Sequence, residues 1–176
     1  MIETPRLILR DWREADLEPW AALNADPEVM RHFPATLTRI ESDASAASYR
    51  DHIDRHGFGR WAVERREDGV FLGSTGLMSL HDTNPLAPGF EAGWRLARHA
   101  WGQGYATEAA RAALDFGFTA TGLKQIVAFT SADNLPSQAV MERLAMTRRP
   151  DLDFDHPALP EGHVLRRALV WVKPAA

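Results

Sequence analysis

The sequence predicts a single mixed α/β domain spanning residues 1–176. Three observations lead to this fold class. The chain has 176 residues, of which 45% are hydrophobic, so one core of useful size is available. Segments with an apolar period of two alternate along the chain with segments of helical period. Between residues 90 and 130 the order strand, helix, strand predicts two parallel strands joined by a crossover.

The chain begins with a predicted strand over residues 6–12, in which Leu7 and Leu9 alternate with other residues after Thr4-Pro5. A helix follows over about 17–24, and Asp26-Pro27 ends or redirects it.

A second helix is predicted from Thr38 to His56. Thr38 is a plausible N-cap, because Glu41 stands three residues later and completes a capping box. Gly57 ends this helix. Its surface is polar, and the candidate anchors to the core are Ile40, Ala44, Ala47, Tyr49 and Ile53.

The period changes to two after Gly59. Residues 59–65 and 70–80 predict an antiparallel hairpin around the turn Glu67-Asp68-Gly69. A loop follows over residues 82–89, rich in Pro, Asn and Gly. The next strand covers residues 90–96, with alternate side chains on opposite faces: Phe90, Ala92, Trp94 and Leu96 on one, and Glu91, Gly93 and Arg95 on the other.

The second half of the chain predicts a helix that ends near Gly122, a strand over 125–130, and a short helix that follows Asn134. Residues 151–162 predict a polar loop, and residues 164–172 a final strand. Small residues dominate one surface of the first of these helices, so it can pack close to a sheet. They are Ala106, Ala109, Ala110, Ala113 and Gly117, together with Leu114.

Composition excludes several classes of function. The net charge of −4 does not favour nucleic acid as a partner, and the absence of cysteine excludes disulfides and thiolate sites. Residues 1–6 lack a signal-peptide pattern, and no apolar run approaches the length of about 20 residues that spans a bilayer. We therefore expect a cytoplasmic protein that binds no membrane. His52 and His56 have the spacing of a metal pair, but no third ligand is evident, so we expect a solvated face and no metal.

The most informative segment is the loop of residues 101–107 between the strand over 90–96 and a helix. Small residues at such a junction expose backbone N–H groups at the positive end of a helix dipole, where phosphate or pyrophosphate binds. Ala106 is small enough to allow close approach of a ligand. The alternative is a glycine-rich turn that binds nothing.

Other glycine motifs fit less well. A dinucleotide fingerprint needs a third glycine where this chain has Thr107, and an acidic residue about 20 positions later, which is absent. A P-loop needs Gly-Lys-Ser/Thr, which is also absent. The segment Gly73-Ser74-Thr75-Gly76 lacks the spacing of a nucleophile elbow and stands within a predicted strand.

Two segments together resemble the motifs of a known family, in sequence and in order. They are Glu91-Ala92-Gly93-Trp94-Arg95-Leu96 and Trp101-Gly102-Gln103-Gly104-Tyr105-Ala106-Thr107-Glu108. The family that they resemble is the GCN5-related N-acetyltransferase (GNAT) family. The resemblance is strongest to the branch that acetylates ribosomal-protein N-termini. It extends to residues 4–10 and to Asn134-Leu135-Pro136-Ser137, and so covers nearly the whole chain.

The resemblance implies a strongly bent mixed sheet, flanked by helices, whose two central parallel strands splay apart to hold acetyl-CoA. It implies that the backbone of Trp94, Arg95 and Leu96 binds the pantetheine and that Asn134 hydrogen-bonds the cofactor. It assigns the pyrophosphate to Trp101, Gly102, Gln103, Gly104, Tyr105, Ala106 and Thr107. The tyrosine that often acts as general acid in the family would fall at Met141 and is missing, and Ser137 is the substitute that the branch suggests.

The chemistry of amine acetylation supports specific roles. An ammonium must lose a proton, and Glu91 is the preferred base, acting through water. The alternative for Glu91 is an ion pair with a neighbouring arginine. A backbone N–H near Leu96 would stabilise the oxyanion, and Ser137 could protonate the leaving thiolate. For Glu108, in the first helical turn, an interaction with the helix dipole is the preferred role.

The acceptor is a primary amine. The branch suggests a protein N-terminal α-amine, and a small-molecule amine such as an amino acid, polyamine or aminoglycoside is the alternative. A module that binds acyl-CoA without turnover is a further alternative. The acidic segment 151–156, which includes His156, could attract a cationic amine or be an ordinary solvated loop. The family also suggests a homodimer.

Overall fold

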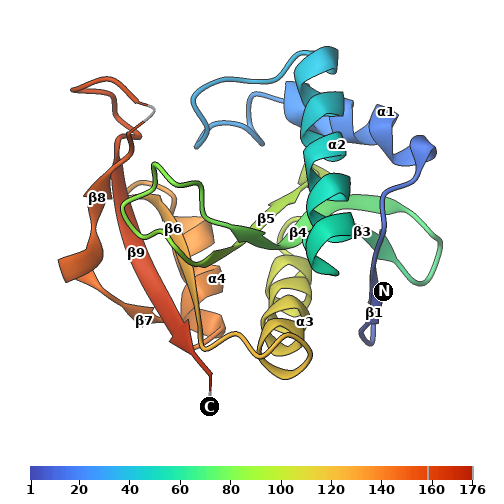
Figure 1. Ribbon diagram of the computed structural model, residues 1–176. Coiled ribbons are helices and arrows are strands. Elements are labelled where there is room, and N and C mark those ends of the chain that lie inside the picture. Colours follow the sequence, from blue (N-terminus) through green and yellow to red (C-terminus); the bar gives the residue numbers. More distant parts are fainter. Residues whose placement is uncertain (158, 176) are drawn as a thin grey trace.

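Among residues 1–157 and 159–175, which the computed structural model describes, one mixed sheet contains nine strands. The strand order is β1-β2-β3-β4-β5-β6-β9-β7, and β8 pairs with β9 outside this path. Among the strand pairs of the described residues, only β5 and β6 are parallel neighbours, as the predicted crossover requires (Figure 1). The strands are β1 (Ile2–Glu3), β2 (Leu7–Arg10), β3 (Arg60–Arg65), β4 (Phe71–Ser79), β5 (Phe90–Leu96), β6 (Gln125–Ser131), β7 (Thr147–Arg148), β8 (Phe154–Asp155) and β9 (Arg167–Pro174).

Helices cover both faces of the sheet. One face packs against α1 and α2 through a cluster that includes Trp12, Trp20 and Ala62, and the other packs against α3 and α4. None of the described helices is both long and apolar enough to cross a bilayer. The helices are α1 (Leu17–Ala25), α2 (Arg39–His56), α3 (Tyr105–Thr119) and α4 (Leu135–Arg143), with 3₁₀ turns η1 (Glu14–Asp16), η2 (Arg98–Ala100) and η3 (Pro150–Leu152).

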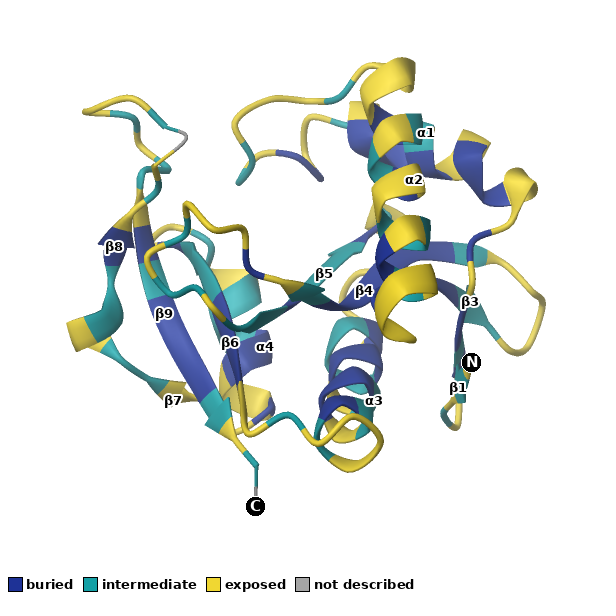
Figure 2. Ribbon diagram, viewed as in Figure 1, coloured by how far each residue is buried: buried dark blue, intermediate teal, exposed yellow. Residues whose placement is uncertain are grey.

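The predicted limits of α2 are confirmed, but its predicted core face is only partly correct, because Tyr49 and Ile53 pack against the core whereas Ile40, Ala44 and Ala47 are exposed. Thr38 caps the helix in a capping box with Glu41, and Gly57 ends it in a left-handed conformation. Ile40 is 83% exposed, whereas the buried residues are Ser42, Ala46 and His52. Polar side chains therefore form much of the inner face, and Figure 2 shows an exposed outer face along the helix.

His52 is also not solvated, contrary to the prediction. Its side chain is buried, Nδ1 lies 2.8 Å from the Phe58 carbonyl oxygen, and Nε2 accepts a hydrogen bond from the Ser79 N–H. These contacts define a neutral imidazole that joins α2 to β4. Burial lowers the pKa of His52, partly opposed by the hydrogen bond to Phe58.

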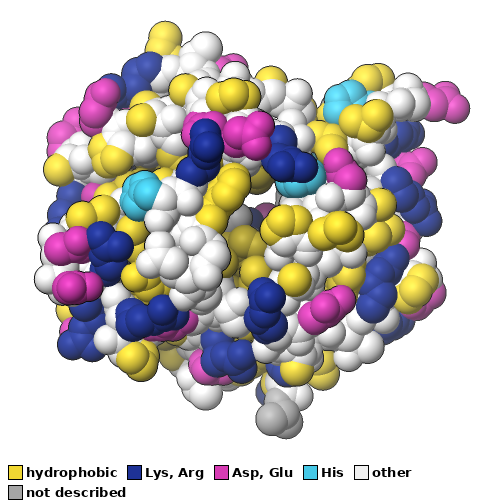
Figure 3. Space-filling view, turned by 180° about the vertical axis from the view of Figure 1, so that it is seen from behind, with side chains coloured by type: hydrophobic (Ala, Val, Ile, Leu, Met, Phe, Trp, Pro, Cys, Tyr) yellow, Lys and Arg dark blue, Asp and Glu magenta, His cyan; other side chains and the backbone are white. Residues whose placement is uncertain are grey.

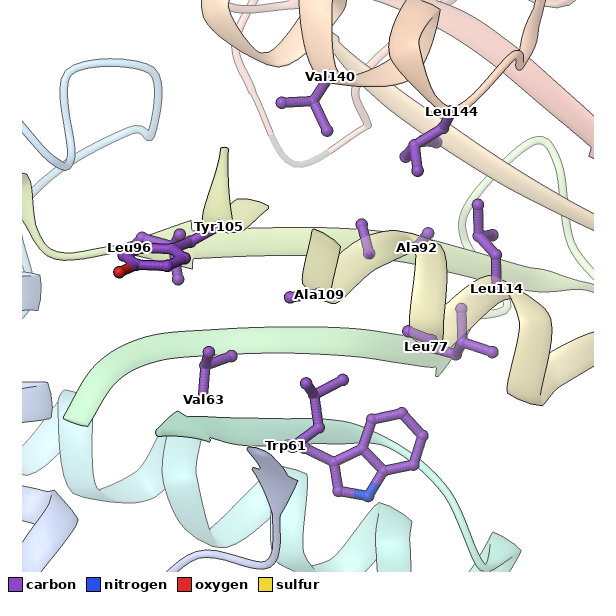
Figure 4. Packing of buried hydrophobic residues seen from close by; sticks show 14 of the residues in the cluster. Trp61, Val63, Leu77, Ala92, Leu96, Tyr105, Ala109, Leu114, Val140 and Leu144 are labelled. Atoms are coloured by element: carbon purple, nitrogen blue, oxygen red, sulfur yellow. The ribbon is translucent and has the colours of Figure 1, made fainter. Parts of the chain in front are cut away.

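Small residues let α3 approach the sheet closely, as predicted. Ala109, Ala110 and Ala113 are fully buried or nearly so. A Cβ at Gly117 would come within 2.6 Å of a Leu77 methyl group, so this position has no room for a side chain without movement. Figure 4 shows Ala109 and Leu114 on α3 in the same cluster as Leu77 of β4. Val140 and Leu144 of α4 lie on the side of α3 away from Leu77.

The later part of the chain differs most from its prediction. The final strand begins at Arg167, because hydrogen-bonded turns occupy residues 160–166 and leave Val164 86% exposed. Three strands, β1, β7 and β8, were not predicted. Each has two residues, too few to produce a periodic pattern.

Candidate active site

The centre of the sheet is open because β5 and β6 separate. In the described chain they share one registered pair, Glu91 with Val127, although β5 pairs with β4 over its whole length. The Ala97 N–H donates to β4, so the alternation of an antiparallel ladder turns the N–H groups of Trp94 and Leu96 toward β6. Two backbone donors therefore lie on an unpaired strand edge.

A cleft of about 1600 Å³ is lined by both sides of this opening. The surface seen in Figure 3 is hollowed near its centre, with hydrophobic side chains and several Lys or Arg side chains around the hollow. The walls come from segments far apart in the sequence. They include parts of residues 3–5, 28–34, 91–96, 100–108 and 129–143, with Arg60, His156 and a few later residues.

The loop before α3 has the conformation that an anion site requires. Gly102 and Gly104 have φ values of 72° and 79°, which favour glycine, and Gly104 is the N-cap of α3. The first backbone bond of the helix runs from the Glu108 N–H to the Gly104 carbonyl, so the preceding N–H groups of the first turn have no partner within the helix. Cleft-lining residues of this loop include Trp101, Gly102, Gly104, Tyr105, Ala106 and Thr107.

Gln103 and Trp101 hold the loop in this shape. Gln103 Nε2 donates to the His99 carbonyl at 2.8 Å, and Trp101 Nε1 donates to the Leu96 carbonyl at 2.8 Å. The second bond ties the loop to the open edge of β5. Gln103 is not among the cleft-lining residues, so its side chain supports the loop from outside the cleft.

Glu108 fastens the N-terminal segment to α3, which sequence reasoning missed. Its carboxylate accepts hydrogen bonds from Thr4 Oγ1 at 2.6 Å and from Arg6 N and Nε at 3.0 and 2.7 Å. Burial would raise the pKa of Glu108, but these hydrogen bonds outweigh it and hold the pKa below its ordinary value. The family resemblance includes both the segment Thr4-Pro5-Arg6 and Glu108. No local pattern indicates that they are in contact, because they lie about 100 residues apart in the sequence.

Trp94 and Ser137 meet across the cleft. Trp94 Nε1 donates to Ser137 Oγ at 3.1 Å, which connects β5 with the first turn of α4. Asn134 caps α4, because its Oδ1 accepts from the Ser137 N–H at 3.2 Å while its Nδ2 donates to Thr130 Oγ1 at 2.8 Å. All three predicted residues line the cleft, and Asn134 also has a structural function as the cap of α4, while its bond to the cofactor stays a prediction.

Glu91 lies where β5 leaves β6 and is paired with an arginine. Arg60 Nη2 is 3.0 Å from Glu91 Oε1, and both side chains are mostly buried. Arg60 reaches Glu91 across two glycines, since it is in register with Gly76 of β4, which is in register with Gly93 of β5. The ion pair that was the alternative for Glu91 is therefore present, and the role of Glu91 as a base stays a prediction.

The described residues contain no group of three or more His, Asp or Glu side chains arranged to hold a metal ion. His56, the other half of the proposed pair, stacks beside His52 with ring centroids 4.3 Å apart. In the segment 151–156, the carboxylates already engage arginines: Asp151 binds Arg149, Asp153 binds Arg148, and Asp155 lies near Arg166 and Arg167.

Comparison with known families gives one match to a family model, the acetyltransferase (GNAT) domain, over residues 6–147. Two relatives have informative names. The chain is 27% identical over 162 residues to the uncharacterized N-acetyltransferase YnaD of Bacillus subtilis, covering 92% of this chain and 89% of the relative. It is 33% identical over 174 residues to the FsC-acetyl coenzyme A-N(2)-transacetylase of Aspergillus fumigatus, covering 93% and 73%.

Solved structures share the fold. A GNAT-family acetyltransferase from Bacillus anthracis has a TM-score of 0.81 at 23% identity, covering 98% of this chain and 97% of that one. A ribosomal L7/L12 alpha-N-protein acetyltransferase in complex with coenzyme A has a TM-score of 0.77 at 15% identity, with coverage of 98% and 96%. A spermidine N-acetyltransferase from Vibrio cholerae in complex with CoA and spermine has a TM-score of 0.75 at 19% identity, with coverage of 97% and 96%.

Proposed function

The chain belongs to the GNAT acetyltransferase family and is an acetyl-CoA-dependent acetyltransferase, and from this premise we propose that it transfers the acetyl group directly to a primary amine within the central cleft. The observation that carries the proposal is the open edge of β5, which leads from the loop before α3 to Glu91. A cleft of about 1600 Å³ exceeds the roughly 300–1,000 Å³ of a pocket for one drug-sized ligand. Both substrates can therefore be bound together.

The residues present fit acetyl-CoA, which when bound supplies the acyl group as an activated thioester. The N–H groups of Gly102 to Thr107 and the dipole of α3 would hold the pyrophosphate without a metal or a lysine. The N–H groups of Trp94 and Leu96 would bind the extended pantetheine as a strand edge binds a neighbour. Asn134 would contribute one remaining N–H, since each of its side-chain groups already has one bond.

The acceptor amine must lose a proton before it attacks. Glu91 would accept this proton through water, and its ion pair with Arg60 fixes the orientation of the carboxylate at the splay. One of the backbone N–H groups on this edge of β5, fixed by pairing of β5 with β4, would stabilise the negative charge that develops on the carbonyl oxygen.

Ser137 would donate a proton to the leaving thiolate. Its oxygen already accepts a hydrogen bond from Trp94 Nε1, which polarises the hydroxyl and strengthens it as a donor. The hydroxyl hydrogen is left for the sulfur, because no acceptor for it is found among the described residues.

The acceptor class has two candidates. A protein N-terminal α-amine follows from the sequence resemblance, and one structure of the same fold carries that name. A small-molecule amine is supported by the relative of 33% identity, named for transfer to an N(2) position, and by the fold of a spermidine enzyme. The single-domain organisation, the homodimer and the cytoplasmic location expected from the sequence stay predictions.

The replacement Glu91→Gln tests the mechanism. We expect the rate of CoA release with a productive amine to fall by about 10²–10⁴-fold, the range typical of a lost general base. The affinity for CoA, measured by calorimetry, is expected to stay the same. Glu142→Gln is the matched control, because Glu142 is exposed on α4. Unchanged turnover in Glu91→Gln would refute the role of Glu91, and absence of turnover by the wild type across broad amine panels would refute the proposed transfer.

A further inference from the structure

The part of the cleft beside the α1–α2 connection contains an arginine that has no carboxylate partner. Arg95 lines the cleft, and its Nη1 donates to Asn24 Oδ1 at 2.6 Å. Its Nε is buried without a hydrogen-bond partner, and no ion pair of Arg95 is found among the described residues. Burial lowers the pKa of Arg95, an effect that the interaction with Tyr49 opposes and the nearby charge of Arg60 reinforces. The guanidinium is a partly desolvated cation whose charge nothing in the described chain neutralises.

Aromatic side chains hold this guanidinium in place. The Arg95 Cζ lies 4.1 Å from the ring centroid of Phe33 and 5.2 Å from that of Trp20. Stacking covers the faces of a guanidinium and leaves its edge available for hydrogen bonds in its own plane. Since Phe33 also lines the cleft, the arginine is fixed in the wall of the cleft before any ligand binds.

A second guanidinium lies on the same face of β5. Arg60 extends over Gly93, where a Cβ would fall within 2.1 Å of Arg60 Nη2, so glycine is required for this arrangement. Arg60 Nη2 contacts Glu91, while Arg60 Nε is buried without a partner. Along the face formed by Glu91, Gly93 and Arg95, two guanidinium groups therefore accompany one carboxylate.

The other charges in this part of the cleft do not balance Arg95. Glu28 lies 3.8 Å from Arg31, and Glu91 is already paired with Arg60. An unpaired, partly buried cation is unfavourable, and an anionic group of a ligand would relieve it. A planar carboxylate matches the edge of a guanidinium, because both can form two parallel hydrogen bonds.

Resting on the proposed function, we infer that the amine acceptor is a small molecule that carries a carboxylate, such as an α-amino acid, and that Arg95 with Arg60 binds this carboxylate. The amine would then face Glu91 on the same side of β5. A polyamine would instead place a second ammonium group beside Arg60 and Arg95, where like charges repel. The Arg95 side chain acts independently of its backbone, whose N–H points toward β4 and, contrary to the prediction, not toward the edge of β5 proposed for the cofactor.

The test compares amino acids with amides of matched size that lack the carboxylate, and with amines of the other candidate classes. We would measure kcat/KM of CoA release for L-amino acids, for the corresponding amino-acid amides, for spermidine and for short peptides with free N-termini. The wild type is expected to prefer at least one amino acid over its amide by at least about tenfold, the effect of one charge-assisted contact. A preference for amides, spermidine or peptides over amino acids would overturn the inference.

Variants assign the preference to Arg95. In Arg95→Gln the ratio between acid and amide is expected to fall close to one, and Arg95→Lys, which keeps the charge without the planar edge, is expected to keep part of it. Arg98→Gln is the matched control, because Arg98 is 60% exposed and does not line the cleft. A full preference for the acid in a folded Arg95→Gln, verified by its circular dichroism and CoA affinity, would overturn the inference.

A binding measurement separates this inference from the proposed function. N-acetylated amino acids and their amides are titrated calorimetrically into the wild type saturated with CoA. Tighter binding of the acids, lost in Arg95→Gln, supports the carboxylate site even if the amine panel shows no turnover, a result that would contradict the proposed transfer. Equal binding of acids and amides contradicts the carboxylate site and leaves the transfer reaction unaffected.

Discussion

The two halves of the cleft are built in different ways. The half beside α3 and α4, which we call the cofactor half, offers mainly backbone N–H groups, from the loop before α3 and from the edge of β5. The half beside α1 and α2, which we call the acceptor half, offers side chains, chiefly Arg60, Arg95 and Phe33. Backbone donors fit any ligand of the right shape and phosphate charge, whereas side chains can change without changing the fold. The fold itself therefore determines the acetyl-CoA site, whereas a few side chains determine which acceptor can bind.

The largest expected effect on CoA affinity comes from Gly104→Glu, which should damage the cofactor half alone. A residue other than glycine is strained at φ 79°, and a carboxylate at the N-terminus of α3 repels phosphate. We expect CoA affinity to fall by about 100-fold or more, or roughly 3 kcal/mol, measured by calorimetry.

The control for this effect is Gly122→Glu. Gly122 has a similar φ of 71° but lies beyond the other end of α3 and does not line the cleft. It should lose a similar amount of stability and keep its CoA affinity. Equal losses of affinity in the two variants would contradict the proposed pyrophosphate site.

The next effect concerns Ser137, at the boundary of the two halves. Ser137→Ala removes the proposed proton donor and the acceptor of the Trp94 N–H. We expect kcat to fall by about tenfold or more, with CoA affinity within about twofold, since general acid groups contribute roughly 10²–10⁴-fold and water can replace part of this. Ser137→Thr keeps the hydroxyl and should recover most of the rate. Wild-type kcat in Ser137→Ala would show that the thiolate leaves without this donor.

Glu108→Gln should weaken the contact between α3 and the N-terminal segment, which form part of the cofactor half. Loss of charge-assisted hydrogen bonds to Thr4 and Arg6 is expected to lower the free energy of unfolding by about 1–2 kcal/mol. The wild-type carboxylate has a lowered pKa, so its stabilisation is present above the ordinary value of 4.5 and is lost as pH falls through the folded value. Urea unfolding at pH 7 and pH 4 should therefore show a smaller difference between wild type and variant at pH 4. A constant difference would contradict this.

The smallest expected effect concerns the pH dependence of stability and comes from His52, which joins α2 to β4 beside the acceptor half. His52 has a pKa lowered by burial, so the unfolded chain binds the proton more tightly, and stability is lost as pH falls below the ordinary value of 6.5. We expect His52→Gln to reduce this slope, by less than about 1.4 kcal/mol per pH unit. A slope that stays the same in His52→Gln would contradict the role of His52.

Much of the cofactor half could be predicted from the sequence because its information is local. The limits of β5, the start of α3 and the cap at Asn134 depend on a few adjacent residues. The family resemblance also rests on these segments, and the family match confirms it. The two-residue strands and the position of β9 depend on pairing with distant segments and could not be read from a local pattern.

The acceptor half could not be predicted, because its contacts also join segments that are far apart in the sequence. Arg60 and Glu91 meet because strand register places Arg60, Gly76 and Gly93 in one row, and Gly93 leaves space for the guanidinium. Phe33 stands in an irregular connection and reaches Arg95 only after folding. His52 lies on a helix whose inner face is polar, so no hydrophobic pattern marked it as buried, and its contacts with Phe58 and Ser79 form only after folding.

Hydrogen exchange with and without CoA tests the central claim most directly, because that claim concerns individual backbone N–H groups. CoA is expected to slow exchange at Trp94, at Leu96 and across residues 102–107, and to leave the α1–α2 connection over residues 26–38 unchanged. Protection that fell on residues 26–38 instead, with none at the β5 edge or in the loop before α3, would contradict the division of the cleft into a backbone-built donor site and a side-chain-built acceptor site.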